Sequence, residues 1–451
     1  MRATQSVDED RAYRRLLGFI VASQPVAALL GGLYASYFMI YATDVLLVAP
    51  VVMGTLIALA RIYDGASDLA VGSLGDRLRS RHGRRRPFIM AGSLFLLAAI
   101  GLWLPPSGLG GMGLVLFLAV MLLLLETGRS MVNVSIGALG VEVARTPQRR
   151  TFTNALAGFA GLAGTIGALM LMQHLIDSGD PRSAGAGLFV ALPLVVSATF
   201  LVAATMLREV KLPQSGEERP VLPMLREVLA VGYHRQLLGV QMAEVFAYTS
   251  IGFAAPYVMR YVLGAEGQTS LVLIAFFVAW HLSPFGWLQL VPRMGMKRVW
   301  EVGQWLWLAT FASVPLLFVF GVPAFIFSAM LGGIATGAST VSYAMLGDLA
   351  DYDAKVSGRQ RQGIYMTIYL LVGKIAAAVV AFLLGVMLQV SGFVPNAEQG
   401  ATAIAAMMAA TTVLPAAAMA AGLWLLSRYR FYEEEGFADG RRRQASAVVQ
   451  A

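Results

Sequence analysis

The chain contains no cysteine and only four histidines among its 451 residues, and only 13% of its residues are charged. Without cysteine it cannot form disulfides, thiolate-bound metal sites or iron–sulfur clusters, and four histidines leave little for a multi-histidine metal or haem centre. A soluble globular chain carries about 25% charged residues. The sequence also holds no GxSxG or HExxH motif, no P-loop and no GxGxxG in the βαβ setting of a dinucleotide-binding fingerprint. These absences argue against a soluble protein and against an enzyme.

Hydrophobic residues are abundant instead: they make up 57% of the chain, and the mean hydropathy is +0.68. Apolar runs long enough to cross a bilayer as helices recur from one end to the other. We therefore predict an all-α polytopic membrane protein with twelve transmembrane helices. The expected spans are residues 17–42, 47–72, 87–106, 111–139, 152–176, 186–207, 235–262, 269–290, 299–320, 322–347, 361–390 and 401–427.

Basic residues alternate between successive loops. They gather in the N-terminal arm, in every second loop and in the tail, whereas the intervening loops hold only Arg182 and Arg260. The positive-inside rule then places both termini in the cytoplasm and requires an even number of spans. Topology accounts for the net charge of +8, so we expect no nucleic-acid partner.

The longest polar connection divides the spans six and six. The expected parts are a cytoplasmic N-terminal arm, an N-terminal six-helix bundle, a cytoplasmic central connection, a C-terminal six-helix bundle and a cytoplasmic tail, at residues 1–16, 17–207, 208–234, 235–427 and 428–451. The loops RSRHGRRRP and RMGMKR occupy equivalent places after spans two and eight. This pattern suggests an internal repeat, which transporters use around a site at the middle of the membrane.

Charged residues lie inside the second expected span, in the segment RIYDGASD at residues 61–68. The i, i+3, i+4 spacing places Arg61, Asp64, Ser67 and Asp68 on one helix face. A charge at membrane depth costs at least about 2.5–3.5 kcal/mol, so such residues face an interior or a wet cavity. Their oxygens suit Na⁺, Li⁺, H₃O⁺ or a proton. The alternative is a structural salt bridge from Arg61 to Asp64 or Asp68, but one arginine cannot neutralise two acids, and we predict a cation or proton site.

A second charged pair lies in the fourth expected span. Glu126 and Arg129 are three residues apart, and Ser130 and Asn133 follow on nearly the same face. The pair could neutralise itself, or it could meet a ligand. Both interpretations stay open at this point.

Two more charges stand in the second half. Lys374 is the lysine placed deep in a span, where an ammonium needs an acid partner or an anionic ligand, and we predict a coupling or gating role rather than snorkelling. Glu244 is a lone acid in the seventh span, and the sequence suggests no partner for it.

The loop after the second span is a candidate conformational latch. An acid close to a helix end can engage arginines and the N-terminus of a neighbouring helix. The residues that would form the latch are Asp76, Arg77, Arg84, Arg85 and Arg86. The alternative is a solvated run of charges that only sets topology.

The segment RIYDGASD followed by VGSLGDRLRSRHGRRRPFIM, and the later AMLGDLADYDAKVSGRQRQGIY with Lys374 downstream, resemble the signatures of the melibiose permease family. These are the glycoside–pentoside–hexuronide:cation symporters of the major facilitator superfamily, and the likeness spans most of the chain. It implies a twelve-helix bundle with alternating access. It also implies that Asp64 and Asp68, with Ser67 between them and Ser130 assisting, bind the coupling cation, and that Lys374 lies near that site.

The sugar site of the family matches less well. Its two carboxylates fall on Ala28 and Asn133, and its stacking tryptophan falls near Gly137. An arginine at the start of helix five corresponds to Arg149 or Arg150. Coupling looks retained, whereas specificity looks changed.

Together these features predict a secondary transporter of the inner membrane, functional as a monomer among membrane lipids, that couples Na⁺ or H⁺ to the symport of a small solute and needs no cofactor. A sugar, glycoside or sugar acid is the expected substrate, and Arg129 would suit an acidic one if Glu126 does not already hold it. A carrier of an amphiphile such as a lysolipid is the near alternative, and a non-transporting membrane sensor is the more distant one. The candidate substrate-binding residues are Glu126, Arg129, Asn133, Arg149 and Arg150.

Overall fold

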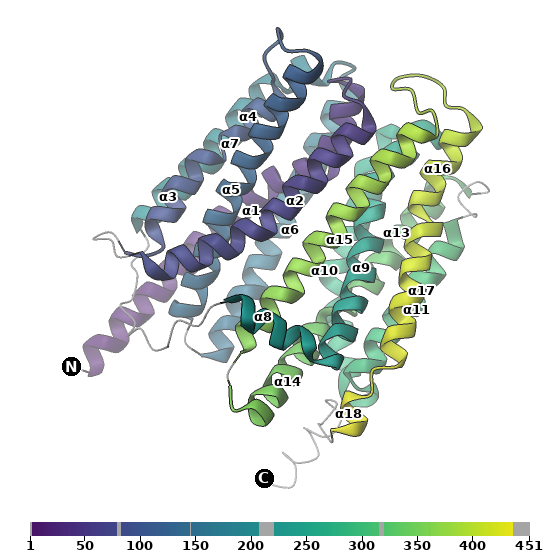
Figure 1. The fold of residues 1–451 in the computed structure, drawn as a ribbon. Coiled ribbons are helices and arrows are strands. Elements are labelled where there is room, and N and C mark those ends of the chain that lie inside the picture. The colour runs from purple at the N-terminus through teal and green to yellow at the C-terminus, as the bar shows by residue number, and fades with distance from the viewer. Residues whose placement is uncertain are drawn as a thin grey trace. The chain divides into compact units, whose positions relative to one another are not determined.

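The computed structural model describes residues 2–78, 83–144, 146–206, 221–314, 320–359 and 361–435. Within these ranges all regular secondary structure is helical. The helices belong to two compact units, Met1–Ser215 and Gly216–Ala451 (Figure 1). The prediction of an all-α polytopic membrane protein is confirmed.

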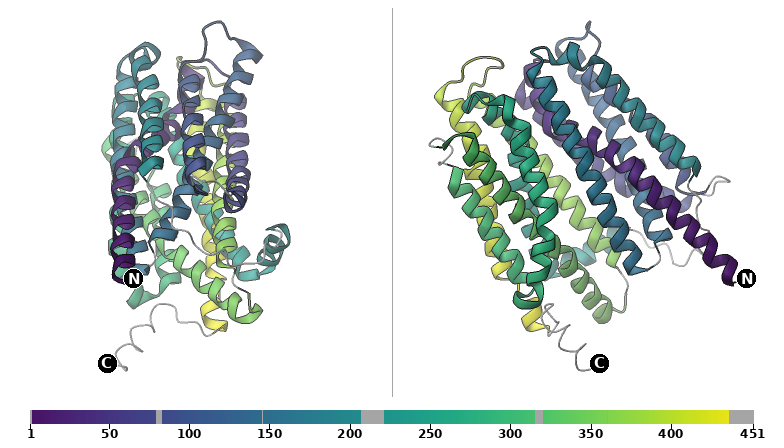
Figure 2. Two further views of the ribbon diagram at one scale, coloured as in Figure 1. Left: turned by 90° about the vertical axis from the view of Figure 1, so that its left-hand side faces the viewer. Right: turned by 180° about the vertical axis from the view of Figure 1, so that it is seen from behind.

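The N-terminal unit is built from long helices that run alongside one another (Figures 1 and 2). Helix α1 packs along α6 and α7, while α5 packs against both α2 and α3. The residues expected to form a separate arm are helical and continue directly into the first span. The helices are α1 (Arg2–Asp44), α2 (Pro50–Arg77), α3 (Arg86–Phe95), α4 (Ala98–Trp103), α5 (Gly111–Val143), α6 (Pro147–Asp177) and α7 (Pro181–Met206).

The C-terminal unit is centred on α9, which packs against α15 and α17. Helix α13 in turn packs against α10 and α11. The elements are α8 (Val221–Ala230), α9 (Gly232–Tyr257), the short η1 (Val258–Val262) and η2 (Glu266–Gln268), α10 (Thr269–Met294), α11 (Met296–Ser313), α13 (Val322–Gly337), α14 (Thr340–Ser357), α15 (Gln362–Val390), α16 (Ala401–Thr411), α17 (Val413–Ser427) and α18 (Phe431–Glu434).

Ten helical segments in the described ranges are long and apolar enough to cross a membrane. Two of the twelve expected spans, those at α2 and α11, are not among them. Helix α2 carries three charges near its centre, and α11 has only 18 residues with three charges close to its start. Both exceptions therefore arise from polar residues within otherwise apolar segments.

Three of the expected spans are each divided between two helices, and the span expected at 87–106 is divided between α3 and α4. At the other two breaks a hydroxyl bonds back to the helix. The span expected at 322–347 is divided between α13 and α14, and there the Ser339 hydroxyl donates to the Thr336 carbonyl at 2.7 Å. The span expected at 401–427 is divided between α16 and α17, where the Thr412 hydroxyl donates to the Met408 carbonyl at 2.6 Å. Such back-bonding bends helices, and an apolar pattern alone does not reveal it.

Helices α1 and α6 approach each other closely at a glycine. A Cβ atom on Gly164 would lie only 2.0 Å from the carbonyl oxygen of Pro25. Small residues at helix crossings let backbones approach in membrane proteins, where packing rather than the hydrophobic effect drives association. Gly164 therefore permits the α1–α6 contact, and any larger residue would force the helices apart.

Helix α7 has a well-defined start. The Asp180 side chain accepts hydrogen bonds from the backbone N–H groups of Arg182 at 3.2 Å and Ser183 at 3.3 Å. With Pro181 as the first helical residue, Asp180 acts as an N-cap. Hydrogen bonds from the Ser183 hydroxyl and backbone hold the pKa of Asp180 below its usual range.

Candidate functional site

Asp64, Ser67 and Ser130 form a buried polar cluster where α2 packs on α5. The Ser130 hydroxyl donates to Asp64 Oδ1 at 3.1 Å, and the Ser67 and Ser130 oxygens lie 2.5 Å apart. Ser67 can also donate to the Asp64 carbonyl oxygen at 3.0 Å. The structure therefore brings three of the four residues predicted for the cation site into direct contact.

The cluster is rich in acceptor oxygens. Each hydroxyl has one proton to donate but two lone pairs, and an ionised carboxylate only accepts. Once the two hydroxyl protons are used, lone pairs on Ser67, Ser130 and Asp64 remain. Asp68, the fourth predicted residue, is half-buried one turn further along α2 and within electrostatic reach of Arg129. This oxygen set suits a hard monovalent cation or a proton.

Beside the cluster, Glu126 is fully buried between two arginines. Arg129 Nη1 lies 3.2 Å and Arg61 Nη1 lies 3.9 Å from its carboxylate oxygens. The structural alternative for Arg61 was an ion pair with Asp64 or Asp68, but the acid it faces across helices is Glu126. Glu126 thus neutralises part of the positive charge that could otherwise offset the two aspartates.

Tyr34 of α1 also lies at this site, although the sequence did not predict it. Its ring lies under both arginines, with the Cζ atoms of Arg61 and Arg129 at 5.4 Å and 5.8 Å from the ring centroid. Such cation–π contacts stabilise desolvated guanidinium groups. The Tyr34 hydroxyl is buried and has no hydrogen-bond partner in the described part of the chain. A tyrosine within an apolar first span was the only available signal.

The remaining candidate substrate residues lie elsewhere in the unit. Asn133 is exposed on α5, one turn beyond Arg129. Arg149 pairs with Asp10 at 2.5 Å, and Arg150 donates to the Ala144 carbonyl at 2.9 Å. Ala144 is about 27 Å from Glu126 along the helix axis, given a rise of 1.5 Å per residue. Glu126 and Arg129 are thus close together, whereas Arg149 and Arg150 lie at the helix ends.

Two arginines of the predicted latch fasten helix ends within the N-terminal unit. Arg86 donates from Nε to the Ala204 carbonyl at 2.6 Å and from Nη2 to the Thr205 carbonyl at 3.3 Å. These carbonyls belong to the last described turn of α7, and carbonyls at a helix C-terminus attract cations. Arg85 is buried against α2, so that a Cβ on Gly75 would lie 2.5 Å from its Nη1.

The other members of the predicted latch are less defined. Arg84 is half-buried. The side chains of Asp76 and Arg77 lie outside the described residues, so a latch that includes them remains a prediction.

In the C-terminal unit, Lys374 is half-buried on α15. Its neighbour Gly373 faces Val245 and Gln241 of α9. The hydroxyl of Tyr369 also donates to Gln241 at 2.5 Å. These contacts place this stretch of α15 against α9, and the coupling role of Lys374 remains a prediction.

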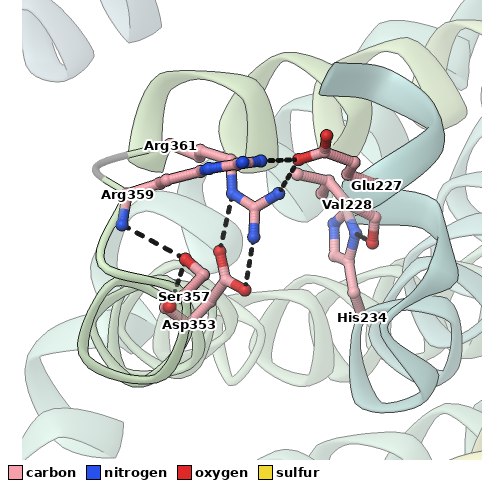
Figure 3. Close-up of polar contacts among 7 residues, drawn as sticks. All are labelled: Glu227, Val228, His234, Asp353, Ser357, Arg359 and Arg361. Carbon is pink, nitrogen blue, oxygen red and sulfur yellow. Dashed lines mark hydrogen bonds and ion pairs between the residues drawn. The ribbon is translucent and has the colours of Figure 1, made fainter. Parts of the chain in front are cut away.

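An ion-pair network with a buried centre joins α8, α14 and α15 in the same unit (Figure 3). Arg361 donates from Nε to Asp353 Oδ2 at 3.0 Å and from Nη2 to Asp353 Oδ1 at 2.8 Å. Its Nη1 also donates to Glu227 of α8 at 2.5 Å, and Arg359 reaches the same oxygen at 2.9 Å. From the sequence these arginines indicated only the membrane topology. In the structure, Arg361 links α8, α14 and the start of α15.

Comparison with known proteins shows the family. Residues 18–433 match the model of the MFS/sugar transport protein family. The inner membrane symporter YicJ of Escherichia coli is 26% identical, with 87% of this chain and 86% of that protein aligned. The putative glycoside/cation symporter YagG of E. coli is 24% identical, over 75% of this chain and 74% of YagG.

A solved structure agrees on the fold. The crystal structure of the nucleoside transporter NupG superposes with a TM-score of 0.66 at 13% identity, covering 91% of this chain and 98% of NupG. The family, the named relatives and this neighbour are transporters rather than enzymes. The chain belongs to the MFS/sugar transport protein family, within the major facilitator superfamily, as the motifs at residues 61–68 and beyond predict.

Proposed function

We propose that this transporter couples a monovalent cation, Na⁺ or H⁺, to the symport of a sugar or glycoside, and that Asp64, Ser67, Asp68 and Ser130 bind the cation. The observation that carries the proposal is the convergence of the Asp64 carboxylate with the hydroxyls of Ser67 and Ser130. A buried carboxylate with hydroxyl ligands supplies oxygen donors at membrane depth, where charged side chains mark ion pathways.

Charge balance supports a single monovalent cation. When all are ionised, the acids Asp64, Asp68 and Glu126 exceed the arginines Arg61 and Arg129 by one negative charge. An uncompensated charge in a low-dielectric interior is costly. One bound Na⁺ or one proton removes this excess, whereas an empty site retains it.

The same contacts bear on the substrate. An acidic sugar would need Arg129 to be available, but Arg129 already faces Glu126 at 3.2 Å. A neutral sugar or glycoside needs hydroxyl and amide partners, and we propose the exposed Asn133 and, once the site opens, the buried Tyr34 hydroxyl for this role. The name of YagG refers to a glycoside and a cation. An amphiphile as substrate is not favoured, because the family and both reported relatives point to sugar or symport.

The loop charges and the family support a proposal for location and mechanism. We place the protein in the plasma (inner) membrane with both termini in the cytoplasm, working as a monomer by alternating access. Cation and solute bind together, and each raises the affinity for the other by the same factor.

The test is uptake into proteoliposomes that contain the purified protein. Radiolabelled neutral glycosides, free sugars and sugar acids are offered under an inward Na⁺ gradient, an inward H⁺ gradient or neither. We expect one gradient to drive a neutral sugar or glycoside above its equilibrium level. Gradient-independent equilibration of every solute would contradict coupling, and accumulation of sugar acids alone would contradict the substrate class.

A further inference from the structure

The strongest unassigned feature is a carboxyl group inside the C-terminal unit. Glu244 of α9 is 2% exposed. Its Oε2 accepts a hydrogen bond from Trp300 Nε1 of α11 at 2.8 Å. The Ser339 hydroxyl, beside α14, is also near Glu244 and can give its one proton either to this carboxyl or to the Thr336 carbonyl. The sequence suggested no partner for Glu244, and the structure supplies neutral ones. No ion pair joins Glu244 to a cation anywhere in the described ranges.

The surroundings of Glu244 are neutral or weakly acidic. Tyr369 of α15 and Tyr343 of α14 are near enough to interact with it electrostatically. The charged or basic groups on the helices packed around α9 include Lys374 on α15, His281 on α10 and, on α11, Lys297, Arg298 and Glu301. Glu301 is engaged by Arg298 at 3.1 Å and Lys297 at 3.9 Å. None of these cations reaches Glu244 in the described chain.

A second, independent observation lies one turn from Trp300. The amide of Gln304 is 1% exposed, and neither its nitrogen nor its oxygen has a hydrogen-bond partner in the described residues. The place a Gly422 Cβ would occupy is 3.2 Å from the Gln304 oxygen and 2.9 Å from Ala243, the residue before Glu244. A buried amide that has no protein partner can be satisfied by an ordered water. Gln304 is therefore the polar group of α11 at which the water of the proposal would be held.

We propose that Glu244 is a proton-binding site of the C-terminal unit that is loaded and unloaded during transport, with water held by Gln304 as the donor and acceptor of the proton. In the loading step a hydronium O–H bond breaks and an O–H bond forms on the carboxylate, which leaves water behind. Unloading reverses the step. The Trp300 N–H can donate to Oε2 in both states. This inference rests on the proposed transport function.

Glu244→Gln is the direct test, because the amide resembles the protonated acid and keeps an oxygen for Trp300. Glu301→Gln is the matched control, since it removes a buried acid that has cationic partners. Solute accumulation driven by a pH gradient, and the pH dependence of solute exchange, are measured in proteoliposomes. We expect Glu244→Gln to lose accumulation driven by a pH gradient. We also expect the pH midpoint of exchange to disappear or to move by more than about one pH unit, which is a tenfold change in proton affinity. Exchange itself should persist, and Glu301→Gln should keep the wild-type midpoint.

A second readout does not depend on transport. In pH-difference infrared spectra of the purified protein, we expect a titrating carboxyl band that Glu244→Gln removes and Glu301→Gln retains. This band would survive even if the proposed substrate or coupling were wrong. Should Glu244→Gln fail to fold, Trp300→Phe, which removes one donor, is expected to move the band and the midpoint. If folded Glu244→Gln or folded Trp300→Phe kept the wild-type pH profile, the proposal would be overturned. The absence of a titrating band assignable to Glu244 would overturn it too, because Glu244 would then be a permanently protonated structural acid.

Discussion

At the residue scale, the cation site was largely readable from the sequence. Helical spacing placed Asp64, Ser67 and Asp68 on one face, and the family resemblance added Ser130 from another helix. The contact between Ser67 and Ser130 at 2.5 Å agrees with both. Tyr34 was not predictable, because a contact between α1 and the arginines of α2 and α5 depends on tertiary packing and leaves no periodic signal.

Ser130→Ala should weaken cation binding without unfolding the protein. It removes the hydroxyl that donates to Asp64 at 3.1 Å. A hydrogen bond to a charged group is worth about 1.5–3 kcal/mol, and about 1.4 kcal/mol is a factor of ten in affinity. We expect the cation concentration that gives half-maximal stimulation of uptake to rise about tenfold or more. Ser135→Ala is the control, since Ser135 is also buried on α5 but has no hydrogen-bond partner in the described ranges. Equal effects of the two changes would argue against a role in cation binding.

Tyr34→Phe should keep the ring under Arg61 and Arg129 but lose a hydroxyl. Since that hydroxyl has no partner in the described chain, thermal stability should stay close to wild type. If it binds a sugar hydroxyl, KM for the solute should rise by about five- to tenfold, which corresponds to about 1–1.5 kcal/mol, an ordinary hydrogen bond. An unchanged KM would remove Tyr34 from the substrate site.

At the element scale, periodicity predicted where helices lie but not how they end or bend. The spans expected at 322–347 and 401–427 are both interrupted, at places where Ser339 and Thr412 bond back to the preceding turn. Counting the basic residues in each loop did not predict the ion-pair network around Arg361 either. It depends on α8 and the α14–α15 connection meeting in space (Figure 3).

Asp353→Asn should destabilise the C-terminal unit more than Glu227→Gln. The Asp353 and Arg361 side chains are only 10% and 8% exposed, whereas Glu227 is 43% exposed. Breaking a buried pair costs up to about 3–5 kcal/mol, and exposed pairs contribute about 0–1 kcal/mol. Thermal unfolding in detergent should show the larger drop in Tm for Asp353→Asn.

Glu227→Gln should act locally instead. We expect faster amide hydrogen exchange in α8, residues 221–230, with little change in Tm. A larger loss of Tm in Glu227→Gln than in Asp353→Asn would show that α8 docking, rather than the buried pair, stabilises the unit.

At the scale of the whole molecule, composition and loop charges predicted the class of protein, and the family match confirms it. The substrate is not encoded in the same way. Hydropathy indicates only which helices lie in lipid, whereas solute recognition depends on a few polar side chains that leave no periodic pattern. The resemblance places two family carboxylates on Ala28 and Asn133, so it does not predict the sugar contacts of this chain.

The topology can be tested directly because the chain has no cysteine. Ser107→Cys and Ser357→Cys each introduce a single thiol at an exposed position. We expect a membrane-impermeant maleimide to label position 107 in intact cells, and position 357 only in inverted vesicles. The reverse pattern would place the basic loops outside and contradict the predicted orientation.

The central claim is that the Asp64 cluster binds the coupling cation. The most direct measurement compares wild type and Asp64→Asn in proteoliposomes, following solute accumulation under the driving gradient and solute exchange without one. Asn keeps the size of Asp but removes its charge, so we predict that gradient-driven accumulation is lost while the protein still inserts and folds. Asp68→Asn should behave similarly. A variant that carries both Asp64→Asn and Asp68→Asn provides the decisive result. If it accumulated solute to wild-type levels with undiminished cation stimulation, the Asp64 cluster would not be the binding site of the coupling cation.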